Sequence, residues 1–446
     1  MEIYVINPFQ ASSPHFPIVG IIPSYYSMIW NPQLYGLGYF EVTIPATDEY
    51  FKMLRGGRFL VRAEDINADN GMKYNNAMVI RRVSIKYDAD QGLLMTVSGK
   101  SVKDILSQRI IWDLYTADDA NLTDIIVDLL NAEIVDPVTY TENTILDLAD
   151  QVSDLYDDKT QKDNELIAAK AAYQQAVSQF GPDSDQAKAA KEYVDQVEAE
   201  IFAIVEKIAT KQSIIDYYDD EMDNVQPKRQ IPYIYSTAVD PPQNPPVVTV
   251  QLRGENFGDW VESICMENHL GWDIELTYNG MYFKYKSGTD RSSTVIFSPE
   301  FDNLLSCDYV RSIETFRNTG LVGGDGEGEE QIVVDIGTTT SFNRYEEYID
   351  ATSVTQNDGE IPLAKYKKML KQYGNSAIAR LRNKESIDGE IDTNGAFKIG
   401  EDFDLGDIVT VENGQGISAT VKLVELIYSD DESGPKVTGI FDEWEV

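Results

Sequence analysis

Cysteine and histidine, the side chains most often used as nucleophiles and soft metal ligands, are scarce in this chain. Its 446 residues include two Cys, Cys265 and Cys307, and two His, His15 and His269. Cys265 and His269 lie four residues apart in a predicted helix, where a thiolate and an imidazolium could pair. The apolar neighbours of Cys265 instead indicate the buried side of an amphipathic helix, where free cysteines are common. We therefore expect Cys265 to be a core residue.

Two segments resemble ligand-binding motifs only in part. Gly99-Lys100-Ser101 matches the end of a phosphate-binding loop, but Leu94 stands where that motif needs its first glycine. The acidic segment 325–330 (DGEGEE) offers carboxylates for Ca²⁺, yet it lacks the alternating ligands and distant Glu of an EF-hand. We reject the phosphate loop and interpret the acidic segment as a solvated hairpin tip, with cation binding left open.

The search therefore assigns no catalytic, cofactor-binding or metal-binding residues, and we predict that the chain is not an enzyme. With two histidines, the chain has few residues from which to build a His-based metal site or a serine triad. The 75 Asp and Glu residues still allow a pair of catalytic carboxylates, and 26 Tyr and 5 Trp could contact sugars. The alternative is consequently an enzyme or carbohydrate-binding protein that acts on a cell wall.

Charge and composition restrict the class of protein further. The chain has 37 Lys and Arg against 75 Asp and Glu, a formal net charge of −38, which opposes binding to nucleic-acid phosphates and to anionic membranes. With 42% hydrophobic residues it can bury substantial cores. Two cysteines indicate folding in a reducing cytoplasm. No signal peptide or apolar run of about 18 residues is found, so no membrane insertion is expected.

The first part of the sequence has the pattern of a small β-domain. Up to residue 98, short apolar runs alternate with turn signals, which is typical of an antiparallel barrel or sandwich. We predict a first β-barrel at 1–110, followed by short packing helices at 111–143. Ser101 and Thr123 are expected to cap the helices that follow them.

The clearest periodic signal runs from 145 to 222, where apolar residues recur every seven positions in two blocks. Gly181 and Pro182 separate the blocks, and Asp183 or Ser184 can cap the second helix. We predict an antiparallel coiled-coil hairpin at 144–225, with arms of about 36 residues and about 54 Å. The hairpin is expected to project from the body, with an internal helical pair in a bundle as the alternative.

The seam of this predicted hairpin is interrupted by charge. Lys159, Lys162 and Lys211 fall at positions that otherwise hold apolar residues, so the helices are expected to be locally weak there.

The second half of the sequence predicts three segments. A Pro-rich stretch at 226–246 is expected to be a linker or an extended arm. A small α+β unit follows at 247–307, with a helix capped at Gly258-Asp259 and a hairpin turn at Asn279-Gly280. A second β-barrel is predicted at 308–446, with a helix at 363–383. The predicted fold class is therefore α+β, mainly β: two small β-barrels, an α+β intermediate unit and an inserted coiled-coil hairpin.

Several segments in this order resemble siphophage tail-hub proteins, the tail-tip family related to myophage baseplate hubs and to the N-terminal part of tail-associated proteins. The resemblance covers most of the chain outside the hairpin. One stretch is GYFEVTIPATDEYFKMLRGGRFLVRAED, and another is the block ETFRNTGLVGGDGEGEE. The remaining matching residues are Gly99, Lys100, Ser101, Asp104, Leu106 and Arg109, then Arg344, Glu346 and Asp350, and finally Leu405-Gly406-Asp407.

This resemblance implies a structural protein without cofactors. In such hubs, two barrel domains alternate around a homotrimer and form a pseudo-sixfold ring that joins the tail tube to the tip. The implied neighbours are a tail tube or distal tail protein, a tape measure protein, and tip, fibre or receptor-binding proteins. The implied location is the virion tail tip, after assembly in the host cytoplasm. An acidic lumen would let DNA pass without specific binding.

Overall fold

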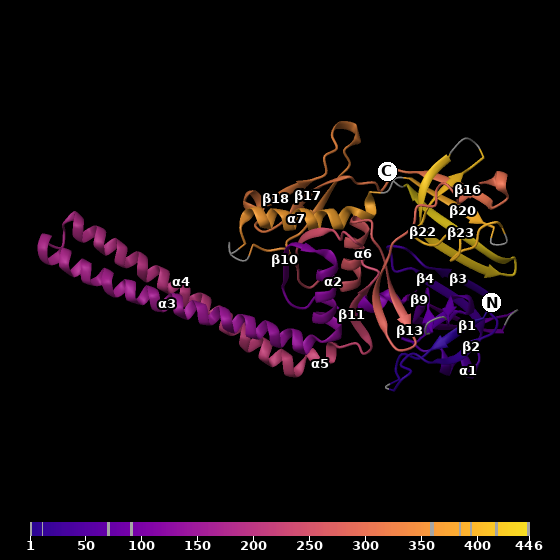
Figure 1. Cartoon of the computed structure of the whole chain (residues 1–446), viewed down its shortest axis with the longest axis horizontal. Coiled ribbons are helices and arrows are strands. Elements are labelled where there is room, and N and C mark those ends of the chain that lie inside the picture. The colour runs from indigo at the N-terminus through magenta and orange to yellow at the C-terminus, as the bar shows by residue number, and fades with distance from the viewer. Residues whose placement is uncertain are drawn as a thin grey trace. The chain divides into compact units, whose positions relative to one another are not determined.

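The computed structural model describes residues 2–10, 12–68, 72–89, 92–356, 361–382, 385–392, 395–414 and 418–443. Met1, Asn383 and Val446, which bound predicted segments, lie outside these ranges. The chain divides into two compact units (Figure 1). The body comprises Met1–Leu130 and Pro232–Val446, and the hairpin unit comprises Asn131–Ile231. The predicted domain boundaries at residues 110, 143, 225, 246 and 307 are not tested by this division and stay predictions.

The largest element of the body is a 13-stranded sheet that contains strands from both ends of the chain. It runs in the order β16-β20-β23-β22-β3-β4-β9-β8-β5-β1-β2, and β21 joins β15 to β22. The strands are β1 (Ile3–Ile6), β2 (Ile18–Ile22), β3 (Ser27–Asn31), β4 (Tyr39–Pro45), β5 (Phe59–Arg62), β8 (Met78–Asp88), β9 (Gly92–Ser101), β15 (Ile296–Phe297), β16 (Leu304–Arg311), β20 (Glu385–Ile391), β21 (Ile408–Glu412), β22 (Ser418–Asp431) and β23 (Gly434–Glu443).

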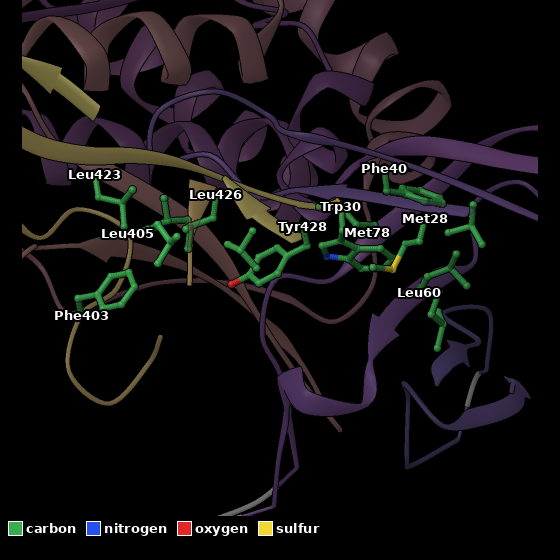
Figure 2. Close-up of a cluster of buried hydrophobic side chains, with 14 of the residues drawn as sticks. Met28, Trp30, Phe40, Leu60, Met78, Phe403, Leu405, Leu423, Leu426 and Tyr428 are labelled. Atoms are coloured by element: carbon green, nitrogen blue, oxygen red, sulfur yellow. The ribbon is translucent and has the colours of Figure 1, made fainter. Parts of the chain in front are cut away.

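The two ends of the chain share one core. Strand β22 pairs with β3, which places Tyr428 opposite Trp30. Figure 2 shows these two side chains between residues of the N-terminal strands, such as Leu60, and residues of the C-terminal segment, such as Phe403. The buried guanidinium of Arg62 lies 3.6 Å from the centre of the Tyr428 ring. Apolar side chains from about 400 residues apart therefore stabilise a single structure.

This pairing corrects the expected pair of barrels. The mainly β, α+β fold class is confirmed, but among the described residues the strands form one shared sheet and no closed barrel. Period-two alternation predicts which face of a strand is buried, not which distant strand lies beside it. The two equivalent barrels that a pseudo-sixfold ring requires are therefore not observed.

Three smaller sheets complete the β structure of the body. Their orders are β11-β14-β13-β7-β6, β10-β12 and β18-β17-β19. The predicted Asn279-Gly280 turn is confirmed, because it joins β13 to β14. The strands are β6 (Ile66–Asn67), β7 (Lys73–Tyr74), β10 (Tyr115–Asn121), β11 (Ile234–Val239), β12 (Val247–Leu252), β13 (Gly271–Thr277), β14 (Met281–Lys286), β17 (Thr319–Gly323), β18 (Val333–Ile336) and β19 (Glu346–Asp350). The Pro-rich segment expected as a linker thus contains strand β11, which pairs with β14.

The helices of the body begin at residues other than the predicted caps. Ser101 precedes a buried 3₁₀ turn, Val102–Gln108, without a capping hydrogen bond from its side chain. Asn121, not Thr123, accepts a hydrogen bond from the first turn of α2, because strand β10 runs directly into this helix. The helices are α1 (Asp48–Met53), α2 (Leu122–Leu130), α6 (Phe257–Glu267) and α7 (Leu363–Ile378). Helix α7 ends before the predicted residue 383, and a 3₁₀ turn, Ala379–Leu381, follows it.

The hairpin unit confirms the predicted coiled coil. Helices α3 (Pro137–Phe180) and α4 (Asp185–Asn224) pack along their length, and Val152 contributes to a cluster with Ile208 and Ile215. Gly181 lies at the turn with φ +84°, and the Ser184 hydroxyl accepts a hydrogen bond from Ala187 N. Helix α3 has 44 residues, about 66 Å at about 1.5 Å per residue. Helix α5 (Gln226–Arg229) follows α4.

The charged seam positions do not interrupt either helix. Lys162 reaches across the hairpin to Glu200 at 2.6 Å, and Lys211 donates to Gln151 Oε1 at 2.8 Å. Each ammonium group thus contacts a polar partner on the facing helix. None of the helices in the described ranges is long and apolar enough to cross a membrane.

Candidate binding groove between helices α6 and α7

An apolar groove of about 240 Å³ lies within the body, between strand β12 and helices α6 and α7. Helices α6 and α7 are labelled in Figure 1. Trp260 and Ile264 come from α6, and Met369 and Tyr373 come from α7. The wall also includes Ala377 near the end of α7. The groove therefore joins segments that are more than 100 residues apart in the sequence.

Helix α6 is held in place by its first turn. Asn256 caps the helix by accepting from Asp259 N, and its amide donates to Ser107 O at 2.8 Å. This corrects the expected cap at Gly258-Asp259. A Cβ on Gly258 would lie 2.1 Å from Ser107 Oγ, so only glycine permits this close approach. The same asparagine and glycine thus set the position of the groove wall that carries Trp260.

Helix α7 is fixed from two sides. A Cβ on Gly374 would lie 2.4 Å from Val322, so glycine allows the helix to pack closely on strand β17. On another face, Lys368 pairs with Asp119 of β10 at 2.9 Å, and Lys365 lies 3.4 Å from Asp118. These exposed pairs add little stability but orient the helix.

A half-buried carboxylate joins the two helices beside the groove. Glu267, at the end of α6, accepts hydrogen bonds from Gln372 and Ser376, which line the groove. Burial raises the pKa of Glu267 to about 7, against the opposing effect of the Ser376 hydrogen bond. Burial also raises the pKa of Glu255, another lining residue. The groove thus combines an apolar floor with acidic groups.

The predicted core role of Cys265 is supported by its position. The side chain is fully buried, and burial raises the pKa of the thiol to about 12. His269 lies after the end of α6, in a left-handed conformation with φ +55°. The helix thus ends before His269, so the four-residue spacing does not place both residues on one helical face.

The first block of residues that matched the tail-hub pattern has structural roles. A Cβ on Gly99 would lie 2.0 Å from Val79 O, so glycine permits the pairing of β9 with β8. Asp104 accepts from Arg81 Nε at 2.6 Å and lies 3.5 Å from Lys100. The remaining members of this block are Ser101 and Leu106, which are buried, and Arg109, whose carbonyl accepts from Phe257 N.

The neighbouring Lys103 was not singled out by the sequence pattern. Its fully buried ammonium donates to the carbonyls of Gln33, Leu34 and Gly36. Burial lowers the pKa of this lysine to about 8. Lys103 therefore ties the turn after β9 to the loop between β3 and β4.

The later matching residues also hold strands in place, at separate points. Arg344 binds Asp335 at 2.6 Å and Glu346, so it connects β18 to β19, and Asp350 accepts from Thr352. Asp407 is buried and accepts from Arg291 Nε at 2.8 Å. Its neighbour Gly406 has φ +96°, and Leu405 is buried. The structure does not bring these residues together with Asp104.

The acidic segment 325–330 includes a 3₁₀ turn, Gly328–Glu330. Asp325 is committed to the fold, because its carboxylate accepts from Gln356 N and its own N–H donates to Tyr366. No group of three or more His, Cys, Asp or Glu suited to a metal ion is found in the parts of the chain that the structure describes. The described geometry therefore gives no support to cation binding by segment 325–330.

The groove itself was not predicted from the sequence. Both of its helices were expected, but periodicity in one segment does not reveal the partner helix. Trp260 and Tyr373 gave the only signal, since large aromatic side chains with polar atoms are frequent in binding surfaces.

A comparison with protein families identifies the group to which this chain belongs. The family described as Siphovirus ReqiPepy6 Gp37-like protein matches residues 2–440. The chain is therefore a member of this siphovirus family, which confirms the siphophage resemblance found in the sequence. No curated protein matches the sequence.

Solved structures with low sequence identity align over most of the chain. The prophage MuSo2 43 kDa tail protein from Shewanella oneidensis has 10% identity and a TM-score of 0.47, with 99% of this chain and 98% of that chain covered. A tail protein from Neisseria meningitidis MC58 has 10% identity and a TM-score of 0.47, with 99% and 96% covered. The Escherichia coli c3393 protein, a type VI secretion component with structural similarity to the bacteriophage T4 tail proteins gp27 and gp5, has 7% identity and a TM-score of 0.40, with 94% and 74% covered.

Proposed function

We propose that the chain is a structural tail-hub protein that forms a homotrimeric ring between the tail tube and the tip of a siphophage. The observation that carries this proposal is membership of a siphovirus family over residues 2–440. It is supported by the ordered sequence stretches that resemble tail hubs. The matching residues Asp104, Arg344 and Asp407 form ion pairs that hold strands and turns in place, as expected of structural rather than catalytic residues.

The acidic composition fits a channel through which DNA passes. A net charge of −38 gives the ring a surplus of carboxylates. Carboxylates along a lumen repel phosphates, so DNA slides through instead of adsorbing. The alternative role of this charge is to keep a large assembly soluble.

The proposed neighbours are a tail tube or distal tail protein, a tape measure protein and tip, fibre or receptor-binding proteins. The proposed location is the virion tail tip, with assembly in the host cytoplasm. The hairpin unit is proposed to contact these neighbours, because its apolar stripe is used between its own two helices.

The mass of the purified particle tests the proposal. Light scattering should give three chains of 50.1 kDa per particle at micromolar concentration. A particle that stays monomeric across the accessible concentrations would contradict the hub.

A second candidate, a cell-wall enzyme, is favoured by one observation. Glu267 has a pKa raised to about 7, the range of a general acid at neutral pH. Release of soluble fragments from labelled cell walls, lost on Glu267→Gln and retained on Glu432→Gln, would support this candidate. The hub proposal expects no release from either protein.

A further inference from the structure

One side of the α3–α4 hairpin exposes large apolar side chains that lie outside its buried seam. A helix that already buries one apolar stripe against a partner ordinarily has a polar outer surface. Here four apolar residues keep between 41% and 69% of their surface accessible, and they are Tyr156, Ile167, Phe202 and Val205. We call these four residues the flank patch. Their exposure indicates a second contact surface, separate from the seam.

An ion pair across the hairpin shows that the flank patch lies on a single side. Helices α3 and α4 run beside each other along their length (Figure 1). Lys170 and Glu198 each directly follow a buried seam residue, Ala169 and Val197, and their side chains meet at 2.8 Å. Positions that follow seam residues therefore lie on the same side of both helices. Every residue of the flank patch directly follows a seam position of the heptad repeat.

The same ion pair places two residues of the patch at one level of the hairpin. Ile167 lies three residues, about one helical turn, before Lys170 on α3. Phe202 lies four residues, also about one turn, after Glu198 on α4. Because the helices are antiparallel, both steps run in the same direction along the hairpin. Ile167 and Phe202 therefore form opposite walls of the groove between the two helices.

Tyr156 and Val205 extend the flank patch along this groove. A hydrogen bond of 2.8 Å joins Lys211 of α4 to Gln151 of α3. Tyr156 lies five residues after Gln151 and Val205 lies six residues before Lys211, so these two apolar residues also share a level. At about 150–250 Å² for each aromatic side chain, Tyr156 and Phe202 alone expose about 180–300 Å². An apolar surface of this size is large enough to mark an interaction site.

The charges around the flank patch are mostly negative. Residues 137–224 contain 20 Asp and Glu against 7 Lys and no Arg. Four of these lysines already form ion pairs with carboxylates of the hairpin: Lys159, Lys162, Lys170 and Lys191. Asp157 and Glu206, which directly follow Tyr156 and Val205, are exposed and form no ion pair among the described residues. The apolar surface is therefore bordered by open carboxylates.

One further carboxylate lies within the patch itself. Asp163 stands four residues before Ile167, at a position that follows a seam position, and it binds Lys159 at 2.7 Å. A carboxylate has acceptor sites for more than one donor, so a partner's Lys or Arg can bind it as well. The patch thus combines apolar walls with an acidic group on the same side.

We propose that the flank patch binds an amphipathic helix of a partner protein, with Lys and Arg on both borders of its apolar stripe. Two neighbouring helices form a groove into which the apolar stripe of a third helix packs. The hairpin of a second copy would bring the same excess of carboxylates to this groove, so charge complementarity selects a basic partner. The inference rests on the proposed contact between the hairpin unit and its neighbours, and it names the chemistry of that contact.

Two synthetic peptides test the site on the full chain by fluorescence anisotropy. The Lys peptide has about three heptads with Leu at the a and d positions and Lys at the other positions. The Glu peptide has Glu in place of every Lys. At about 0.15 M salt, the wild-type chain should bind the Lys peptide at least tenfold more tightly than the Glu peptide.

Substitutions in the hairpin locate the bound peptide. Phe202→Ser and Ile167→Ser should each weaken binding of the Lys peptide by about tenfold, with unchanged far-UV circular dichroism, because both side chains are exposed. Phe180→Ser is the matched control and should leave binding unchanged, since this exposed phenylalanine lies at the end of α3 outside the patch. The double variant Asp157→Asn with Glu206→Gln should weaken binding by about threefold, because exposed ion pairs contribute little.

Several results would overturn the inference. The Lys peptide may bind neither the wild type nor any variant, or bind the wild type, Phe202→Ser and Ile167→Ser equally, which would reduce it to a ligand of scattered surface charge. Equal binding of the Glu peptide would contradict the charge argument. Self-association of the wild-type chain that Phe202→Ser abolishes would assign the flank patch to a second copy.

The particle mass keeps this inference separate from the proposed function. A trimer that binds neither peptide loses the helix-binding site and keeps the hub. A monomer that binds the Lys peptide through Phe202 loses the hub and keeps the site.

Discussion

The contacts that stabilise the hairpin unit join residues much closer in the sequence than the contacts that stabilise the body. In the hairpin, Val152 meets Ile208 and Ile215 across a single turn at Gly181. In the body, Trp30 lies opposite Tyr428, almost the whole chain away. The heptad repeat therefore specifies the hairpin locally, whereas the body forms only when both chain ends come together. This difference predicts that the two units respond separately to mutation.

The largest effect is expected in the body. Trp30→Ala should cost about 3–5 kcal/mol, because it removes a fully buried indole from the shared core. Hydrogen exchange should then quicken in the N-terminal and C-terminal strands together, while α3 and α4 stay protected. If exchange became faster only in strands before residue 300, the strands would belong to two independent β domains instead of one sheet.

A comparable but local effect is expected in the hairpin. Val197→Asp should cost about 3 kcal/mol, since it places a charge in the buried seam. Val205→Asp on the same helix is the control, because Val205 is exposed. Limited proteolysis should cut the Val197 variant within the hairpin only, and degradation of the body would contradict the separation of the units.

A smaller, pH-dependent effect is expected at the α6–α7 groove. Because the pKa of Glu267 is raised to about 7, the stability contributed by its protonated form is fully present below about pH 4.5 and is lost as the pH rises through 7. Glu267→Gln stays neutral, so it should match the wild type near pH 4.5 and exceed it by about 1–3 kcal/mol at pH 8.

Urea unfolding of the Glu267 variant across this pH range measures the difference. Glu432→Gln, an exposed site, should show no such trend. A pH-independent difference for Glu267→Gln would mean that the carboxyl is not desolvated.

The smallest effect is expected when the hairpin is shortened. Replacing residues 144–223 by a Gly/Ser linker should change the melting temperature of the body by no more than about 2 °C, because antiparallel ends can be rejoined. The buried Glu133–Arg229 pair at the base is kept. Loss of soluble protein would show that the helices support the body.

The same contrast explains what could be predicted from the sequence. The hairpin, its turn at Gly181 and the Asn279-Gly280 hairpin depend on nearby residues, and all three were predicted. The β22–β3 pairing and the α6–α7 groove depend on which distant segments meet, which periodicity does not encode.

Electron cryomicroscopy of the purified particle tests the hub proposal most directly. The proposal predicts three copies of the body around an axial channel, with carboxylates along the channel wall. A monomer, a twofold dimer or a particle without a central opening would contradict it.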